Sequence, residues 1–311
     1  MLGELLRRKL IVVAGKGGVG ATTVAAALAA LVAGRGGRAL LVEHDPGGPG
    51  AALFGRRPAL VDPEELQPGL WELALDGNRQ LGRYLELTLG NRALVRAVSS
   101  TELYRYFVDA APGLRELISV GRIFHEIERR SAVETPWDIV VFDAPASGTA
   151  ALLLRMPLVA GAMFGESVVG REARAVARLL TDRRRCAVVL VTAPEPLVIR
   201  ETLESWRELA ALGLQACALV ANRVRTVGYS RADLAALAGL AGARTDHRAL
   251  GPALARARSA LATAERHTRV VRFVARRAGL PTAEIAYTPE LSDLELISHV
   301  TRELQAPATW R

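Results

Sequence analysis

The residues from Gly15 to Thr23 combine glycines, a lysine and two hydroxyl side chains in an arrangement suited to holding phosphate groups. Four of the six residues from Gly15 to Gly20 are glycine. Glycines allow a tight turn that exposes backbone N–H groups, and Thr22 opens an alanine-rich helix whose positive dipole end faces that turn. We therefore predict a phosphate cradle made of Gly15, Lys16, Gly17, Gly18, Val19, Gly20, Ala21, Thr22 and Thr23.

The spacing of these residues follows the P-loop pattern with one part replaced. In that pattern a lysine stands between the last glycine and the hydroxyl residue, but here the position is Ala21. Another lysine, Lys16, directly follows the first glycine. Only two of the 40 basic residues, Lys9 and Lys16, are lysines, which supports a specific role for Lys16.

Two carboxylates follow apolar runs that are typical of buried strands. Asp45 comes after residues 38–42 and Asp143 closes residues 137–142. We expect the Asp45 strand to lie beside the P-loop strand, so that Asp45 can reach a γ-phosphate or its attacking water. Asp-Pro followed by glycines is also ordinary turn chemistry. Asp143 fits the arrangement that orders a water on Mg²⁺, while the Thr22 hydroxyl binds the metal directly.

Asn222 follows the apolar run at residues 216–221. Its amide both donates and accepts, as recognition of an adenine edge requires. Asparagine at a strand end is also a common turn former. Both interpretations of Asn222 stay open at this point.

The elements that must position these residues alternate between strands and helices. The predicted strands are residues 10–14, 38–42, 70–76 as an edge strand, 137–143, 186–191, 216–221 and 281–286. This pattern predicts one α/β P-loop NTPase domain over residues 1–311, with a mostly parallel doubly wound sheet and helices on both faces. Apolar residues at helical spacing predict a helical insertion subdomain at residues 79–130 and a second helical region at 225–277.

Composition limits the classes of function. The net charge of +8 comes from arginines that we interpret as scattered through helices, so it does not favour nucleic-acid binding. No apolar run is long enough for stable membrane insertion, and we expect a cytoplasmic protein. Cys186 and Cys217 lie in apolar runs without Cys-x-x-Cys spacing, which favours buried thiols over a zinc or metalloid site.

Together these motifs resemble those of the ArsA-type ATPases, which include arsenite-pump ATPases and the guided-entry ATPases that target tail-anchored membrane proteins. The resemblance covers roughly the whole chain. It is carried by Gly15-Lys16-Gly17-Gly18-Val19-Gly20, Asp45-Pro46, Asp143-Ala144-Pro145 with Gly148, Pro194-Glu195 with Glu201-Thr202, and Asn222.

The resemblance implies a role for each matching residue. Gly15 to Thr23 would hold ATP, with Thr22 and Asp143 serving Mg²⁺. Lys16 would act across a dimer, Asp45 would orient the attacking water, and Asn222 would contact adenine.

It also implies that helical insertions of two subunits handle a hydrophobic or membrane-protein client. The partner subunit is a second copy or a paralogous ATPase, and Ala21 is either native or engineered. Alternative functions are an arsenite- or antimonite-pump subunit and a nucleotide-gated scaffold similar to the partition and division-site ATPases.

Overall fold

The computed structural model describes residues 2–76, 114–128, 136–242, 250–306 and 309–310. It contains an eight-stranded sheet in the order β3-β4-β2-β5-β1-β6-β7-β8. The strands are β1 (Leu10–Gly15), β2 (Ala39–Glu43), β3 (Glu64–Gln67), β4 (Leu70–Ala74), β5 (Ile139–Asp143), β6 (Cys186–Thr192), β7 (Ala216–Val224) and β8 (Thr282–Ala286). All neighbouring strands pair in parallel except β3 and β4. The predicted mostly parallel α/β sheet is therefore confirmed.

The strand β1 lies inside the sheet between β5 and β6, with Leu10 opposite both Val140 and Cys186. The Asp45 strand is not beside it, as we had expected, because β5 lies between β1 and β2. Parallel pairing nevertheless aligns the strands, and Glu43 at the end of β2 is in register with Asp143 at the end of β5. The segments that follow β1, β2 and β5 therefore leave one edge of the sheet together.

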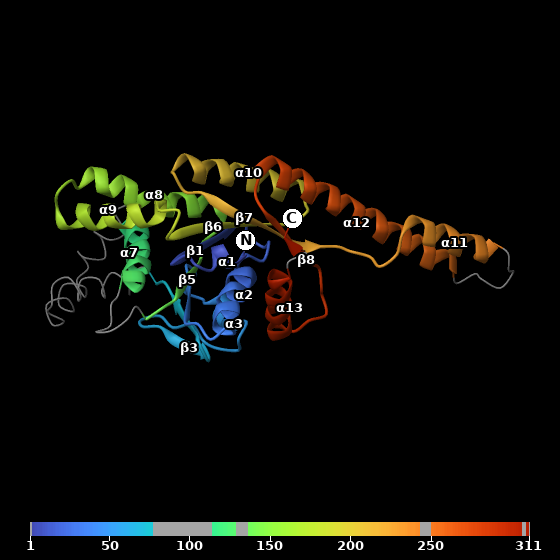
Figure 1. Cartoon of the computed structure of the whole chain (residues 1–311), viewed down its shortest axis with the longest axis horizontal. Helices are drawn as coiled ribbons and strands as arrows, with labels where there is room; N and C mark the ends of the chain where they lie inside the picture. Colours follow the sequence, from blue (N-terminus) through green and yellow to red (C-terminus); the bar gives the residue numbers. More distant parts are fainter. Residues whose placement is uncertain (1, 77–113, 129–135, 243–249, 307–308, 311) are drawn as a thin grey trace.

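Helices cover both faces of the sheet (Figure 1). They are α1 (Leu2–Leu5), α2 (Ala21–Ala33), α3 (Pro49–Ala52), α7 (Leu114–Glu128), α8 (Ser147–Met163), α9 (Val168–Thr181), α10 (Pro196–Ala211), α11 (Arg231–Gly242), α12 (Leu250–Ala278) and α13 (Asp293–Gln305). Alternate residues of β1 point to opposite faces, so Ile11 and Val13 pack with α2 and α13, while Leu10 and Val12 pack toward α8 and α10. The sheet therefore lies between two apolar cores, one on each face.

Most of the predicted insertion at residues 79–130 lies outside the described residues, including its aromatic residues Tyr104, Tyr106 and Phe107. The described part is α7, which packs against α8, α9 and β5. Its Ile123 and Ile127 side chains are buried in the core on that face. In this helix the apolar spacing thus serves packing against the body.

Within the predicted second helical region the structure describes α11 and α12, which extend away from the sheet at one end of the molecule (Figure 1). The prediction of an edge strand at residues 70–76 is wrong. The strand β4 has β2 on one side and β3 on the other, because residues 64–67 form an additional antiparallel strand at the edge.

Candidate functional site

The turn between β1 and α2 has the geometry of the predicted cradle. Gly18 and Gly20 adopt φ angles of 84° and 88°, which favour glycine. Val19 N–H donates to the Lys16 carbonyl across the turn at 3.3 Å. At Gly15 a Cβ atom would lie 2.7 Å from the Val191 carbonyl oxygen, so only glycine allows β1 and β6 to approach here. The sequence therefore folds locally into a turn whose N–H groups stand at the start of α2.

The side chain of Asn222, on β7, stabilises this turn. Its Nδ2 donates to the Val19 carbonyl at 2.8 Å, and its Oδ1 accepts from the Arg223 N–H at 2.9 Å. The side chain is buried, and a Cβ atom on Gly20 would lie 2.3 Å from Nδ2. Asn222 is therefore part of the cradle's support. Its contact with adenine stays a prediction.

Thr22 and Asp143 meet at the mouth of the cradle. Thr22 Oγ1 lies 2.6 Å from Asp143 Oδ2, joining the first turn of α2 to the end of β5. Burial raises the pKa of the Asp143 carboxyl to about 7, although the hydrogen bond from Thr22 opposes the rise. One hydroxyl and one carboxylate are hard oxygen donors of the kind that Mg²⁺ takes together with nucleotide phosphates. The residues present fit that ion.

Asp45 lies at the same edge of the sheet and is exposed. Its charge contributes to the raised pKa of Asp143, so the two carboxyls are electrostatic neighbours. Asp45 Oδ1 also accepts the Gly47 N–H at 2.8 Å, which is the turn contact that Asp-Pro-Gly sequences commonly make. Both sequence-based interpretations of Asp45 thus have a counterpart in the structure.

The sequence analysis did not identify two buried glutamates, Glu43 and Glu72, that hold the segment after Asp45. Glu43 accepts the N–H groups of Gly50 and Ala51 at 2.5 and 2.9 Å, and Glu72 accepts the Ala59 N–H at 2.8 Å. Burial raises the pKa of each to about 7, and the Glu72 charge adds to the rise at Glu43. The pair anchors the segment that follows Asp45. They could have been found in the sequence as glutamates within or at the end of otherwise apolar strands.

Lys16 reaches across the turn to helix α10 of the same chain. Its Nζ lies 2.7 Å from Glu201 Oε1, and both side chains are about one-third exposed. Ala21 is the first residue of α2, where its methyl group cannot extend to a phosphate as a lysine would. In the described part of the chain, no histidine, cysteine and carboxylate side chains gather in a group of three that could hold a metal by themselves.

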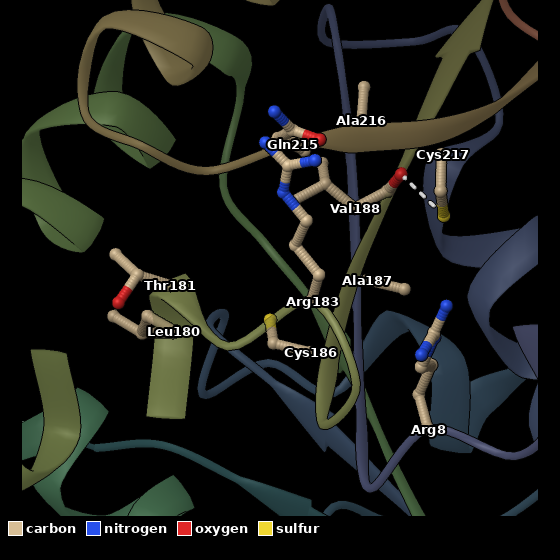
Figure 2. Close-up of a pocket in the computed structure, with 10 residues that line it drawn as sticks. All are labelled: Arg8, Leu180, Thr181, Arg183, Cys186, Ala187, Val188, Gln215, Ala216 and Cys217. Atoms are coloured by element: carbon tan, nitrogen blue, oxygen red, sulfur yellow. Dashed lines mark hydrogen bonds between the residues drawn. The ribbon is translucent and has the colours of Figure 1, made fainter. Parts of the chain in front are cut away.

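The two cysteines lie far from this site along the strands. Both cysteines, together with Arg8 and Arg183, line a cavity of about 220 Å³. Figure 2 shows how these side chains lie around it. Cys186 packs in the core on the α8 face of the sheet, and the partly buried Cys217 packs against the core on the α2 face. Burial raises the pKa of both thiols, that of Cys186 to about 12. The cysteines therefore point to opposite sides of β6 and β7 as protonated thiols.

A parallel sheet whose central strand runs through a glycine-rich turn into a helix, with an acid closing the neighbouring strand, defines the P-loop NTPase class. Residues 8–173 match the family described as anion-transporting ATPases. The chain belongs to this ArsA ATPase family, whose named relatives are ATPases. ATP hydrolysis is accordingly the activity of its family.

Three relatives illustrate the range of the family. The chain is 31% identical to ATPase BagA of Mycobacterium tuberculosis, over 73% of this chain and 68% of that protein. It is 26% identical to the arsenical pump-driving ATPase of Escherichia coli, over 68% of this chain and 38% of the relative. It is also 26% identical to ATPase ASNA1 homolog 1 of Paramecium tetraurelia, over 48% of this chain and 44% of the relative. Across the residues that the structure describes, the helices are too short or too polar to cross a bilayer.

Proposed function

We propose that this chain binds Mg-ATP in the cradle and acts in the cytoplasm. Binding of the nucleotide would drive a dimer switch that handles a hydrophobic client or membrane protein. The observation that carries the proposal is the 2.6 Å contact between Thr22 and Asp143 at the mouth of the glycine turn. This contact supports the proposal because a hydroxyl and a carboxylate are oxygen donors of the kind that Mg²⁺ takes. The lysine of the P-loop pattern is replaced by Ala21.

In the proposed site the phosphates rest on the backbone N–H groups of the turn and on the first turn of α2. Thr22 would bind Mg²⁺ and Asp143 would hold a water on it. The metal would neutralise charge between the phosphates. Asp45 would orient the attacking water once it leaves its turn contact with Gly47.

Replacement of the P-loop lysine by Ala21 should weaken ATP hydrolysis more than ATP binding. A hydrogen bond to a charged group is worth about 1.5–3 kcal/mol, so its loss weakens nucleotide binding by roughly tenfold to somewhat over a hundredfold. Loss of a donor that stabilises transition-state charge costs on the order of a hundredfold to a thousandfold in turnover. We therefore propose a subunit that retains ATP and hydrolyses it weakly.

The dimer part of the proposal rests on Lys16. In the free chain Lys16 is held by Glu201, at a position from which it could exchange this partner for the phosphates of a second subunit. That subunit is either a second copy or a paralogous ATPase that carries the full P-loop lysine.

The alternative of an arsenite- or antimonite-pump subunit draws on the name of the Escherichia coli relative. A soft metalloid needs thiolates that converge. Cys186 and Cys217 pack on opposite faces of the sheet with raised pKa values, which favours the client-handling proposal over the pump. A partition-type scaffold would need a nucleotide-gated surface, and no observation at the cradle favours it.

The test compares ATP turnover of this chain with that of its Ala21→Lys variant, each alone and mixed with any paralogous ATPase of the same genome. We expect Ala21→Lys to raise turnover by on the order of a hundredfold or more. Ala21→Met, which has similar bulk and no charge, is the matched control and should remain slow. If Ala21→Lys binds ATP tightly and remains inactive both alone and in every mixture, the proposed catalytic roles are wrong.

A further inference from the structure

The second helical region carries the whole net charge of the chain. Residues 225–277 contain 11 arginines and three acidic residues, a formal charge of +8, which equals the net charge of all 311 residues. Elsewhere 29 basic residues face 29 acidic ones. Basic residues are thus spread along the chain, but their excess over acidic residues lies in this region and needs an explanation there.

The described part of this region, α11 and α12, forms a basic arm that extends from the sheet (Figure 1). The C-terminal half of α12 is anchored to the body, where Val271, Val274 and Ala278 are buried. Farther out, α11 is tied to α12 by the hydrogen bond from Arg231 Nε to Glu265 Oε1 at 2.7 Å. The arm is thus a helical element that is anchored to the body at one end.

The solvent face of α12 presents a row of arginines. Six of the seven exposed arginines of α12 form it, all except Arg256: Arg258, Arg266, Arg269, Arg272, Arg276 and Arg277. Because most of them recur at intervals of three or four residues, they lie on one side of the helix, opposite the buried Val271 and Val274. At about 1.5 Å per residue the row is roughly 29 Å long. Within the described ranges, none of the six has a carboxylate in ion-pair contact.

An aromatic side chain lies within this row. Phe273 is 53% exposed and its neighbours on the helix surface are Arg269, Arg276 and Arg277. A row of guanidinium groups interrupted by an exposed aromatic ring matches a lipid headgroup layer, where anionic phosphates meet the cations and the ring enters the headgroup–acyl boundary. A straight row also suits a flat surface. Duplex phosphates follow a curved path and offer no apolar layer for Phe273.

We propose that the basic arm binds the surface of a bilayer that contains anionic phospholipids, with the Arg258–Arg277 row facing the headgroups and Phe273 entering between them. The binding is peripheral and electrostatic, and it is independent of the nucleotide site. The arm would hold the ATPase body at the membrane from one end of the molecule.

The test is flotation of the full chain, without nucleotide, on vesicles of phosphatidylglycerol and phosphatidylcholine in equal parts. We expect binding at low salt, release at about 0.5 M salt, and no binding to pure phosphatidylcholine. The triple variant Arg269→Glu, Arg272→Glu, Arg276→Glu should weaken partitioning by on the order of a hundredfold.

The matched control is Arg155→Glu, Arg184→Glu, Arg207→Glu, which makes the same charge change at exposed arginines of the body. It should weaken partitioning by less than about tenfold, since long-range charge contributes less than contact. A glutamine version of the arm variant serves if the glutamate version does not fold, as judged by its thermal unfolding.

Phe273→Ala separates a lipid surface from a nucleic acid. It should weaken vesicle binding severalfold and leave any binding to random duplex DNA unchanged. The proposal is overturned if the chain does not float with anionic vesicles at low salt, or if arm and body variants lose binding equally. Tighter binding to duplex DNA than to the vesicles would overturn it in favour of a nucleic-acid surface.

Discussion

Lys16 Nζ lies 2.7 Å from Glu201 Oε1, so the lysine that would act across a dimer is engaged within its own chain. The two residues are 185 positions apart, and the contact joins the cradle to α10. Any role of Lys16 at a partner's nucleotide therefore begins with release from Glu201. The ion pair would therefore compete with the proposed dimer contact.

Glu201→Gln should strengthen association in Mg-ATP, because it removes the competing carboxylate. A partly exposed ion pair contributes about 0.2–1 kcal/mol, which corresponds to at most about a fivefold change in the dimer dissociation constant. Analytical ultracentrifugation of the chain, alone and with a paralogous ATPase, measures this change. Glu204→Gln on the same helix is the control, since Glu204 pairs with Arg200 at the surface. Weaker association of Glu201→Gln would contradict a competing role for the ion pair.

Alanine substitution should destabilise the protein more at Gly20 than at Gly17, although both glycines lie in the same turn. Gly20→Ala places a Cβ atom 2.3 Å from Asn222 Nδ2 at a residue with φ of 88°, whereas at Gly17 no atom lies within 4 Å of a new Cβ. We expect Gly20→Ala to lower the free energy of unfolding by about 1–3 kcal/mol. Gly17→Ala should change it by less than about 1 kcal/mol. Urea unfolding measures both, and equal losses would mean that Asn222 does not brace the turn.

The buried Glu43–Glu72 pair should make stability depend on pH. Burial raises both pKa values to about 7 in the folded chain, above their ordinary value of 4.5. Between these values the folded state binds more protons than the unfolded state, so the free energy of unfolding should fall as pH rises from about 4.5 to 7. As the pH rises, the segment after Asp45 should lose its structure first, because its N–H groups donate hydrogen bonds to these carboxyl groups.

Glu43→Gln keeps one oxygen acceptor for the segment and removes a titrating group. It should flatten the pH dependence measured by chemical unfolding between pH 5 and about 8. The exposed Glu208→Gln is the control and should retain the wild-type slope. A slope that Glu43→Gln leaves unchanged would show that other groups titrate in this range.

Local patterns were enough to predict the glycine turn between β1 and α2 and the acid at the end of β5. The glycine spacing fixed the turn before α2, and the apolar run before Asp143 predicted β5, because strand, turn and helix are each encoded by neighbouring residues. The 2.6 Å contact between Thr22 and Asp143 then follows once β1 and β5 are adjacent. That adjacency is itself a property of the whole sheet.

Features that depend on distant residues were missed. Strand order is set by packing across the whole sheet, so the sequence did not reveal that β5 separates β1 from β2. The contacts Lys16–Glu201 and Asn222–Val19 span 185 and 203 positions.

The central claim is that Thr22 and Asp143 present a metal-bound nucleotide to the cradle. Calorimetric titration with ATP, in Mg²⁺ and in EDTA, tests it most directly with the chain, Thr22→Val and Asp143→Asn. We predict that Mg²⁺ tightens ATP binding to the chain by roughly tenfold or more and that both variants lose this Mg²⁺-dependent gain. Absence of ATP binding at millimolar concentration, or a gain that both variants keep, would contradict the account.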